Sequence, residues 1–279
     1  MTVAGFIGLG NIGGPMARRL LAHPDGLVVF DVRPESYERL VAKGAQAAAD
    51  VPDVARRADV ISVVVRDDDQ VRDVTTQLLA ASRPGQVIAI HSTIRATTAI
   101  ALAEVAEPLG VSVVDAPISG GAMGAHAGTL AVMVGGSADA VEACRPVFSH
   151  FASMISHMGD VGAGTRAKLA RNLLHFVAFT AVGEAQRLAD AAGISVAELG
   201  AIVRHTDSVT GGPGAIMLRD SVGPLAPDDD WYGVFANVAS LGEKDLTQAL
   251  ELADELGVDT PLARLALERL AAELGVPDE

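Results

Sequence analysis

The chain has 279 residues, which is enough for two domains of ordinary size. Hydrophobic residues make up 49% of it and charged residues 20%, a composition typical of a folded globular protein. The formal net charge of −14 would not attract nucleic acid or an anionic membrane, so neither is expected as a partner. No apolar run has transmembrane length, and no secretory signal fits ahead of a strand predicted from residue 3, so a cytoplasmic protein is expected.

The single cysteine excludes a disulfide framework. Cys144 lies in a helical pattern between Val141 and Val147, where a small core residue is expected. The chain also lacks the Cys and His spacings of zinc sites, so no metal is expected.

The N-terminal segment has the pattern of a dinucleotide-binding turn. An apolar run, residues 3–7, ends in a GxGxxG sequence that opens a helix with Pro15 in its first turn. The first glycine permits a tight turn, the second lets the backbone approach a pyrophosphate, and the third lets helix and strand pack closely. N–H groups at the helix start would face the phosphates. Cofactor contacts are therefore expected from Gly8, Gly10, Asn11, Ile12 and Gly13.

An acidic residue follows the next predicted strand, residues 27–30. Asp31 would accept hydrogen bonds from the ribose hydroxyls and repel a 2′-phosphate, which favours NAD. Arg33 is near enough in the sequence to meet a 2′-phosphate. NAD is the expected cofactor, with NADP as the alternative.

Strand and helix patterns alternate through the first part of the chain. Strands are predicted at residues 60–65, 86–90 and 111–114, and helices at 34–43, 51–57 and 96–109. The acidic run 67–69 indicates another helix N-terminus. Such alternation predicts a doubly wound parallel sheet, whose ligands bind beyond the carboxyl ends of the strands.

The second part of the chain shows only helical patterns. One long helix is predicted from 165 to 192, stopped by Gly193, and others at 196–205, around 215–218, at 244–256 and at 261–274. The predicted fold is an α/β Rossmann-type doubly wound parallel sheet domain, residues 1–161, followed by an all-α C-terminal domain, residues 162–279.

Lys168 and Asn172 are the strongest candidates for chemistry. They are four residues apart in a predicted helix and so share one of its faces. A lysine among apolar residues is costly to bury unless it has a partner or a task. An ammonium beside an amide suits a proton donor next to a group that orients the substrate.

Four segments, in order and spanning nearly the whole chain, resemble the β-hydroxyacid dehydrogenase family, which includes 3-hydroxyisobutyrate dehydrogenase and tartronate semialdehyde reductase. They are the glycine-rich stretch 5–17, Asp115-Ala116-Pro117-Ile118-Ser119-Gly120-Gly121 with the glycines that follow it, the stretch 162–172, and Lys244-Asp245-Leu246.

The resemblance implies a role for each matching position. Lys168 would be the catalytic lysine and Asn172 would hydrogen-bond the substrate. The loop of Ser119, Gly120 and Gly121 would hold the substrate carboxylate. The resemblance also aligns five positions with cofactor contacts, namely Val65, Arg66, Gln70, Thr93 and Lys244.

The chain departs from the family pattern in three places. Relatives usually have Leu-Pro or Met-Pro where this chain has Val65-Arg66, and often an acid at the position of His91. The usual C-terminal extension, which helps to finish the substrate pocket in relatives, is short here. This third departure bears on the identity of the substrate and not on the hydride chemistry.

The resemblance implies an NAD(P)-dependent oxidoreductase for a small carboxylate-bearing β-hydroxy acid or semialdehyde, with Lys168 as general acid and base. It also implies a homodimer or higher oligomer formed through the helical half. An imine reductase is one alternative, but such enzymes generally lack this lysine. A dinucleotide-binding sensor without turnover is another, and it would not need Lys168 together with Asn172.

Overall fold

The computed structural model describes residues 2–214 and 223–276 and divides into two compact units, residues 1–171 and 172–279. The predicted helix around 215–218 lies outside the described residues. The division at 161/162 inferred from the sequence remains a prediction. It lies just before one long helix (Ala163–Ala191), whereas the boundary between the two compact units falls inside that helix.

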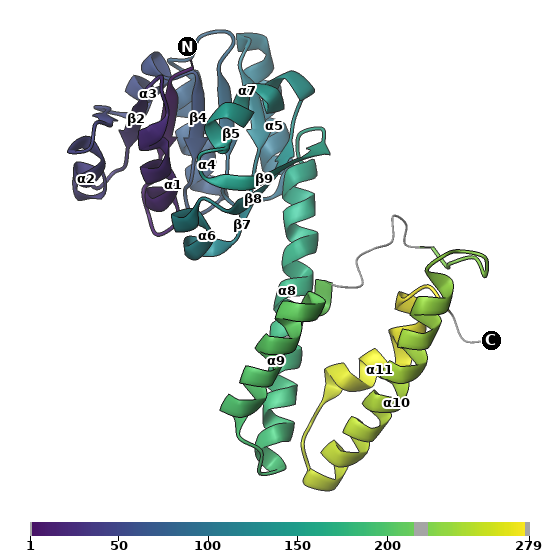
Figure 1. Ribbon diagram of the computed structural model, residues 1–279. Coiled ribbons are helices and arrows are strands. Elements are labelled where there is room, and N and C mark those ends of the chain that lie inside the picture. The colour runs from purple at the N-terminus through teal and green to yellow at the C-terminus, as the bar shows by residue number, and fades with distance from the viewer. Residues whose placement is uncertain (1, 215–222, 277–279) are drawn as a thin grey trace. The chain divides into compact units, whose positions relative to one another are not determined.

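A nine-stranded sheet forms the centre of the first unit (Figure 1). Its strand order is β3-β2-β1-β4-β5-β6-β8-β7, and β9 pairs with β8. The strands are β1 (Ala4–Ile7), β2 (Leu27–Phe30), β3 (Gln46–Ala47), β4 (Val60–Val63), β5 (Val87–Ile90), β6 (Ser112–Asp115), β7 (Ile118–Ser119), β8 (Leu130–Gly135) and β9 (Ala152–Gly159).

Pairing from β3 through β6 is parallel throughout, as predicted for a Rossmann-type sheet. Beyond β6 the sheet is mixed, because β8 runs antiparallel to β6 and β7. The last residues of five strands lie in one register row, Ile7, Phe30, Val63, Ile90 and Asp115. The loops after these residues therefore meet at a single edge of the sheet.

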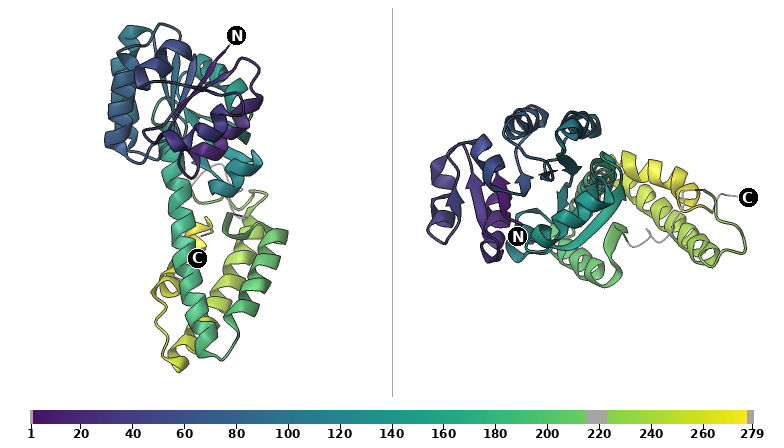
Figure 2. Two further views of the ribbon diagram at one scale, coloured as in Figure 1. Left: turned by 90° about the vertical axis from the view of Figure 1, so that its left-hand side faces the viewer. Right: turned by 90° about the horizontal axis from the view of Figure 1, so that it is seen from above.

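Helices cover both faces of this sheet, as the view from above shows (Figure 2). They are α1 (Gly13–Arg19), α2 (Glu38–Val41), α3 (Val51–Arg57), α4 (Asp68–Leu79), α5 (Ala96–Ala106), α6 (Gly121–Ala127) and α7 (Ala138–Phe148). Short 3₁₀ turns occur at η1 (Leu20–Ala22), η2 (Pro34–Ser36) and η3 (Glu107–Leu109).

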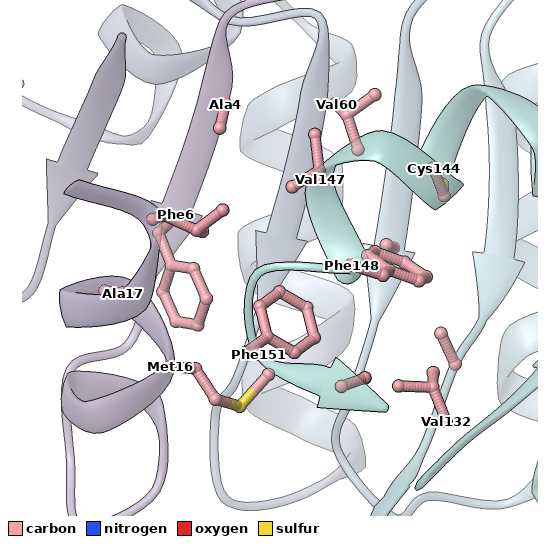
Figure 3. Packing of buried hydrophobic residues seen from close by; sticks show 14 of the residues in the cluster. Ala4, Phe6, Met16, Ala17, Val60, Val132, Cys144, Val147, Phe148 and Phe151 are labelled. Atoms are coloured by element: carbon pink, nitrogen blue, oxygen red, sulfur yellow. The ribbon is translucent and has the colours of Figure 1, made fainter. Parts of the chain in front are cut away.

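Alternation along the strands creates two cores. In β1, Phe6 points to a cluster that includes Met16 of α1 and Phe148 of α7, together with Phe151 (Figure 3). Its neighbour Ile7 points to the other face, where α3, α4 and α5 pack. Burial of apolar residues on both faces is what a parallel sheet requires. Cys144 lies fully buried in the first cluster, as expected.

The second unit is helical in its described part. It holds the C-terminal portion of α8 (Ala163–Ala191), then α9 (Val196–Thr210), η4 (Gly212–Gly214), α10 (Tyr232–Leu256) and α11 (Pro261–Glu273). A small core unites α10 and α11 around Phe235, Ala239 and Leu274.

Two predicted helices have different bounds in the structure. The helix predicted over residues 34–43 is divided at Tyr37 into η2 and α2, because the backbone there makes tighter turns. Conversely, α10 begins at Tyr232 rather than 244, since Phe235 and Ala239 already supply a buried face four residues apart.

Candidate functional site

The glycine-rich loop between β1 and α1 has the geometry that a dinucleotide needs. Gly8 has φ +90°, and a Cβ there would stand 2.0 Å from the carbonyl oxygen of Val64. A Cβ on Gly13 would meet the carbonyl oxygen of Gly8, also at 2.0 Å. Gly10 is exposed, and a Cβ there would have no atom within 4 Å. The loop thus packs tightly at its ends and leaves room at Gly10, which fits a pyrophosphate.

Asp31 stands at the carboxyl end of β2 and fastens the glycine loop. Its Oδ2 accepts the N–H of Leu9 at 2.7 Å, and its Oδ1 accepts the N–H of Arg33 at 2.9 Å. The guanidinium Nε of Arg33 is 3.6 Å from Oδ1. The Asp31 carboxylate is mostly buried while the Arg33 side chain is exposed. The two groups expected to choose between NAD and NADP therefore lie side by side.

The loop after β4 is tied to the loop after β5 through a serine that sequence reasoning did not single out. Ser92 Oγ donates to the carbonyl oxygen of Val65 at 2.6 Å, and the N–H of Val65 donates to Ser92 Oγ at 2.9 Å. The N–H of Arg66 donates to Gln70 Oε1 at 3.1 Å. These hydrogen bonds join Val65 to the loop after β5 and Arg66 to Gln70. Thr93 is exposed beside Ser92.

The loop predicted to hold the carboxylate follows β6. Ser119 ends β7 and pairs in register with Ala131 of β8. Gly120 and Gly121 follow with φ values of +125° and +60°, which side chains with a Cβ rarely adopt. Both glycines are exposed and Ser119 is half-buried. The loop therefore presents exposed glycine backbone next to the serine.

The start of α8 is held by a buried carboxylate. Asp115, at the end of β6, accepts the N–H of Gly162 with Oδ1 at 2.7 Å and the N–H of Thr165 with Oδ2 at 2.6 Å. The backbone of α8 also approaches β8 closely, since a Cβ on Gly164 would stand 2.3 Å from the carbonyl oxygen of Met133. Burial raises the pKa of Asp115, while these N–H groups act in the opposite direction by stabilising its carboxylate.

Lys168 lies one turn into α8 and is buried, with 9% of its surface exposed. Burial, and secondly the positive charge of Arg171, lower the pKa of its ammonium below the ordinary value. Within the described residues no hydrogen bond or ion pair engages this ammonium. A buried amine without a carboxylate partner is costly for stability alone, which marks it as a functional candidate.

The remaining candidates lie in the second unit. Asn172 is half-buried on α8, four residues after Lys168 and so on the same helix face. Lys244 is exposed on α10, with its Nζ 2.8 Å from Oδ1 of Asp245.

In the part of the chain that the structure describes, no group of three His, Cys, Asp or Glu residues could hold a metal ion. None of the helices described there is long and apolar enough to cross a membrane.

Three residues that shape this edge of the sheet received no functional role from sequence reasoning: Asp115, Ser92 and His91. His91 is buried, with its Nδ1 2.7 Å from the carbonyl oxygen of Ala116 and its Nε2 3.1 Å from Ser62 Oγ. Each of them lies just at or after the end of a predicted strand, and that position was the available signal.

Comparison with known proteins matches both halves of the chain. Residues 3–159 match the model for the NAD-binding domain of 6-phosphogluconate dehydrogenase. Residues 162–275 match the model described as NAD-binding of NADP-dependent 3-hydroxyisobutyrate dehydrogenase. An NAD-dependent L-serine dehydrogenase of Pseudomonas aeruginosa is 38% identical, over 94% of this chain and 89% of its own length. The chain belongs to the β-hydroxyacid dehydrogenase family.

Solved structures agree with this membership. A crystallised oxidoreductase of Mycobacterium avium 104 is 50% identical, covers 100% of both chains and has a TM-score of 0.97. The 3-hydroxyisobutyrate dehydrogenase of Mycobacterium tuberculosis, crystallised with L-serine, is 32% identical over 100% of this chain and 96% of its own, with a TM-score of 0.69. The β-hydroxyacid dehydrogenase described here is therefore an NAD(P)-dependent oxidoreductase, and the Rossmann-type fold predicted from its sequence is confirmed.

Proposed function

We propose that this family member oxidises or forms a small β-hydroxy acid, and that Lys168 is its general acid and base. The observation that carries the proposal is the buried Lys168 ammonium, whose pKa is lowered by burial and by Arg171. A lowered pKa raises the share of the neutral amine, which is the form that can accept the hydroxyl proton. The same group, once protonated, stabilises a developing alkoxide in the reverse direction.

The other site residues would bind and orient. Ser119 and the N–H groups of Gly120 and Gly121 would hold the substrate carboxylate, since φ values of +125° and +60° bring that backbone close. Asn172 would hydrogen-bond the substrate from the helix face of Lys168.

The dinucleotide would be held by the loop of Gly8, Gly10, Asn11, Ile12 and Gly13, and by Asp31. Val65, Arg66, Gln70, Thr93 and Lys244 are further proposed contacts. The nicotinamide, when bound, supplies or takes up the hydride. We favour NAD because the buried Asp31 carboxylate would repel a 2′-phosphate, although Arg33 beside it keeps NADP as the alternative.

The proposed substrates are small acids in which a single carbon separates the carboxylate from the carbon that bears the hydroxyl or aldehyde group. The relatives are named for L-serine and for 3-hydroxyisobutyrate, which share that arrangement. A screen of L-serine, 3-hydroxyisobutyrate, 3-hydroxypropionate, glycerate and 4-hydroxybutyrate with NAD⁺ and NADP⁺ tests this. We expect turnover of at least one β-hydroxy acid. The Ser119→Ala variant should have a higher KM for that substrate. Turnover of none of them would favour a dinucleotide-binding sensor.

We further propose that the protein is at least a dimer. In the second unit, α8 presents a row of exposed large apolar side chains, Leu173, Phe176 and Phe179, at helical spacing. Contiguous apolar surface of this kind is typical of an interface. Sedimentation at micromolar concentration should show no monomer, and a purely monomeric species would contradict the proposal.

We place the enzyme in the cytoplasm, in keeping with its acidic surface and single buried cysteine.

A further inference from the structure

An open hollow at the C-terminal end of α1 gathers positive charge on this acidic protein. Its volume is about 590 Å³, and Arg18, Arg19, Leu21, Ala22, Ser149 and His150 line it. No acidic residue is among these lining residues. The helix α1 starts at the glycine loop and ends here, so the hollow lies at the opposite edge of the sheet from the proposed dinucleotide site.

The two arginines of the hollow have no carboxylate partner within the described residues. Arg19 is nevertheless fixed, because its Nε donates to the carbonyl oxygen of His150 at 3.2 Å. Its guanidinium also lies against Gly128, where a Cβ would approach within 2.6 Å. In the same unit six other arginines have an acidic partner: Arg33, Arg56, Arg57, Arg66, Arg83 and Arg145. Arg18 and Arg19 are therefore available for an anion from outside.

A pair of histidines extends this positive cluster. His23 Nε2 lies 2.6 Å from the carbonyl oxygen of Thr2, which can only accept, so Nε2 carries the proton. The other ring nitrogen of His23, Nδ1, shares a hydrogen bond with His150 Nε2, 3.2 Å away. The Nδ1 of His150 has no hydrogen-bond partner in the described residues, so it can donate to an anion when the ring is protonated.

The surroundings of His150 favour its neutral form when no anion is present. Burial, then the neighbouring His23, then Arg19 lower the pKa of His150. A bound anion would reverse the balance, because it offsets the charge of Arg19 and accepts a hydrogen bond from the imidazolium.

We propose that this hollow binds a small phosphate-type oxyanion through Arg18, Arg19 and the protonated ring of His150. Planar guanidinium groups match the geometry of phosphate oxygens, and a tetrahedral anion can contact several donors at once. The anion is either free phosphate or the phosphoryl group of a small metabolite. The inference is independent of the proposed hydride chemistry, because none of these residues belongs to the proposed catalytic or cofactor-binding set.

The test follows the imidazole proton signal of His150 by NMR in the NAD⁺-saturated enzyme, at constant ionic strength set with chloride. Saturation with NAD⁺ removes competition from the glycine loop. Millimolar inorganic phosphate should raise the pKa of His150 in a saturable manner. An unchanged His150 titration in the presence of phosphate overturns the proposal.

Variants assign the effect to the hollow. Arg18 has no hydrogen bond or ion pair in the described residues, so Arg18→Gln removes its charge from the hollow without breaking either. The variant should weaken phosphate binding about tenfold, or about 1.4 kcal/mol. Arg39→Gln removes the same charge from an exposed position on α2, outside the hollow, and should leave binding unchanged. Equal binding by Arg18→Gln and the wild type, or equal losses in both variants, contradicts a local site.

Two further measurements distinguish the role of His150 and the source of the anion. Sulfate keeps its charge between about pH 5.5 and about pH 8, so a pH dependence of its binding comes from the protein. Protonation of His150 should make sulfate bind more tightly to the wild type at the lower pH, and this difference should be absent from His150→Gln. pH-independent sulfate binding in the wild type contradicts the role of His150. Tighter binding of glycerol 3-phosphate than of phosphate supports a metabolite as ligand, and equal binding supports free phosphate.

Discussion

Asp115 Oδ2 accepts the backbone N–H of Thr165 at 2.6 Å, which places the carboxyl end of β6 directly under the helix that carries Lys168. The other oxygen accepts the N–H of Gly162 at 2.7 Å. The sheet thereby fixes both the position and the rotation of the first turn of α8. Since Lys168 is three residues past Thr165, its side chain is oriented by a contact that it does not itself make.

Asp115→Asn should therefore lower both stability and turnover. Asparagine has one acceptor oxygen, so its amide N–H₂ would face one of the two backbone N–H groups. We expect a loss of about 1–3 kcal/mol in the free energy of unfolding in urea, with a fall in kcat larger than the change in KM. Asp50→Asn is the matched control, because Asp50 caps α3 by accepting the N–H of Asp53 and asparagine caps equally well. Similar kcat values for Asp115→Asn and the wild type would contradict the positioning role.

His91 makes the fold sensitive to acid. Burial lowers the pKa of this histidine to about 4, from an ordinary value near 6.5, and its hydrogen bonds to Ala116 and Ser62 suit the neutral ring. The unfolded chain binds the proton first as the pH falls. The contribution of neutral His91 to stability is thus complete above pH 6.5 and is lost as the pH falls toward 4. The free energy of unfolding falls by about 3 kcal/mol over this range.

Urea unfolding between about pH 4 and about pH 7.5 measures this loss. The stability of His91→Gln should vary less steeply with pH than that of the wild type, even if the variant is less stable throughout. His126→Gln, at an exposed histidine, should keep the wild-type slope. Identical slopes in all three proteins would rule out His91 as the group responsible.

Asp31 should determine the choice of dinucleotide. Asp31→Asn keeps an acceptor for the N–H of Leu9 but removes the negative charge that would repel a 2′-phosphate. We expect the ratio of kcat/KM for NAD⁺ to that for NADP⁺ to fall by about tenfold, mainly through tighter use of NADP⁺. Arg33→Gln should move the ratio the other way. An unchanged ratio in both variants would mean that neither group contacts the ribose.

The charge of Arg171 should be visible in the pH profile of the reaction. This charge lowers the pKa of Lys168, in second place after burial. In the oxidation direction kcat/KM should rise with pH as Lys168 loses its proton, and Arg171→Gln should shift that rise to higher pH. Arg166→Gln removes an equal charge from an exposed position on the same helix and should leave the profile in place. A profile that moves equally in both variants would indicate a general charge effect.

The sequence was sufficient for the Rossmann-type half because its signals are local. The run before Gly8, the glycine spacing and the acid at Asp31 each follow from one strand or turn, and the structure has β1, α1 and β2 there. By contrast, the pattern of residues 118–159 was not resolved into β7, β8 and β9, which are stabilised by pairing between segments distant in sequence. Asp115 likewise shows its function only through partners about fifty residues away, at Gly162 and Thr165.

Some of the candidate site could be predicted and some could not. The burial of Lys168 agrees with its apolar surroundings in the sequence, since helical spacing places it on an inner face. The tie between Val65 and Ser92 joins two strand ends whose adjacency follows only from strand order. The roles of Asn172 and Lys244 remain predictions drawn from family resemblance.

Lys168→Met tests the central claim most directly, because methionine fills a similar volume without a proton to exchange. The measurement is kcat with the best substrate of the screen, together with the Kd for NAD⁺ from fluorescence titration. We predict a loss of about 10²–10⁴-fold in kcat with an unchanged Kd. A variant that binds NAD⁺ normally and keeps kcat within about threefold of the wild type would contradict the role of Lys168 as general acid and base.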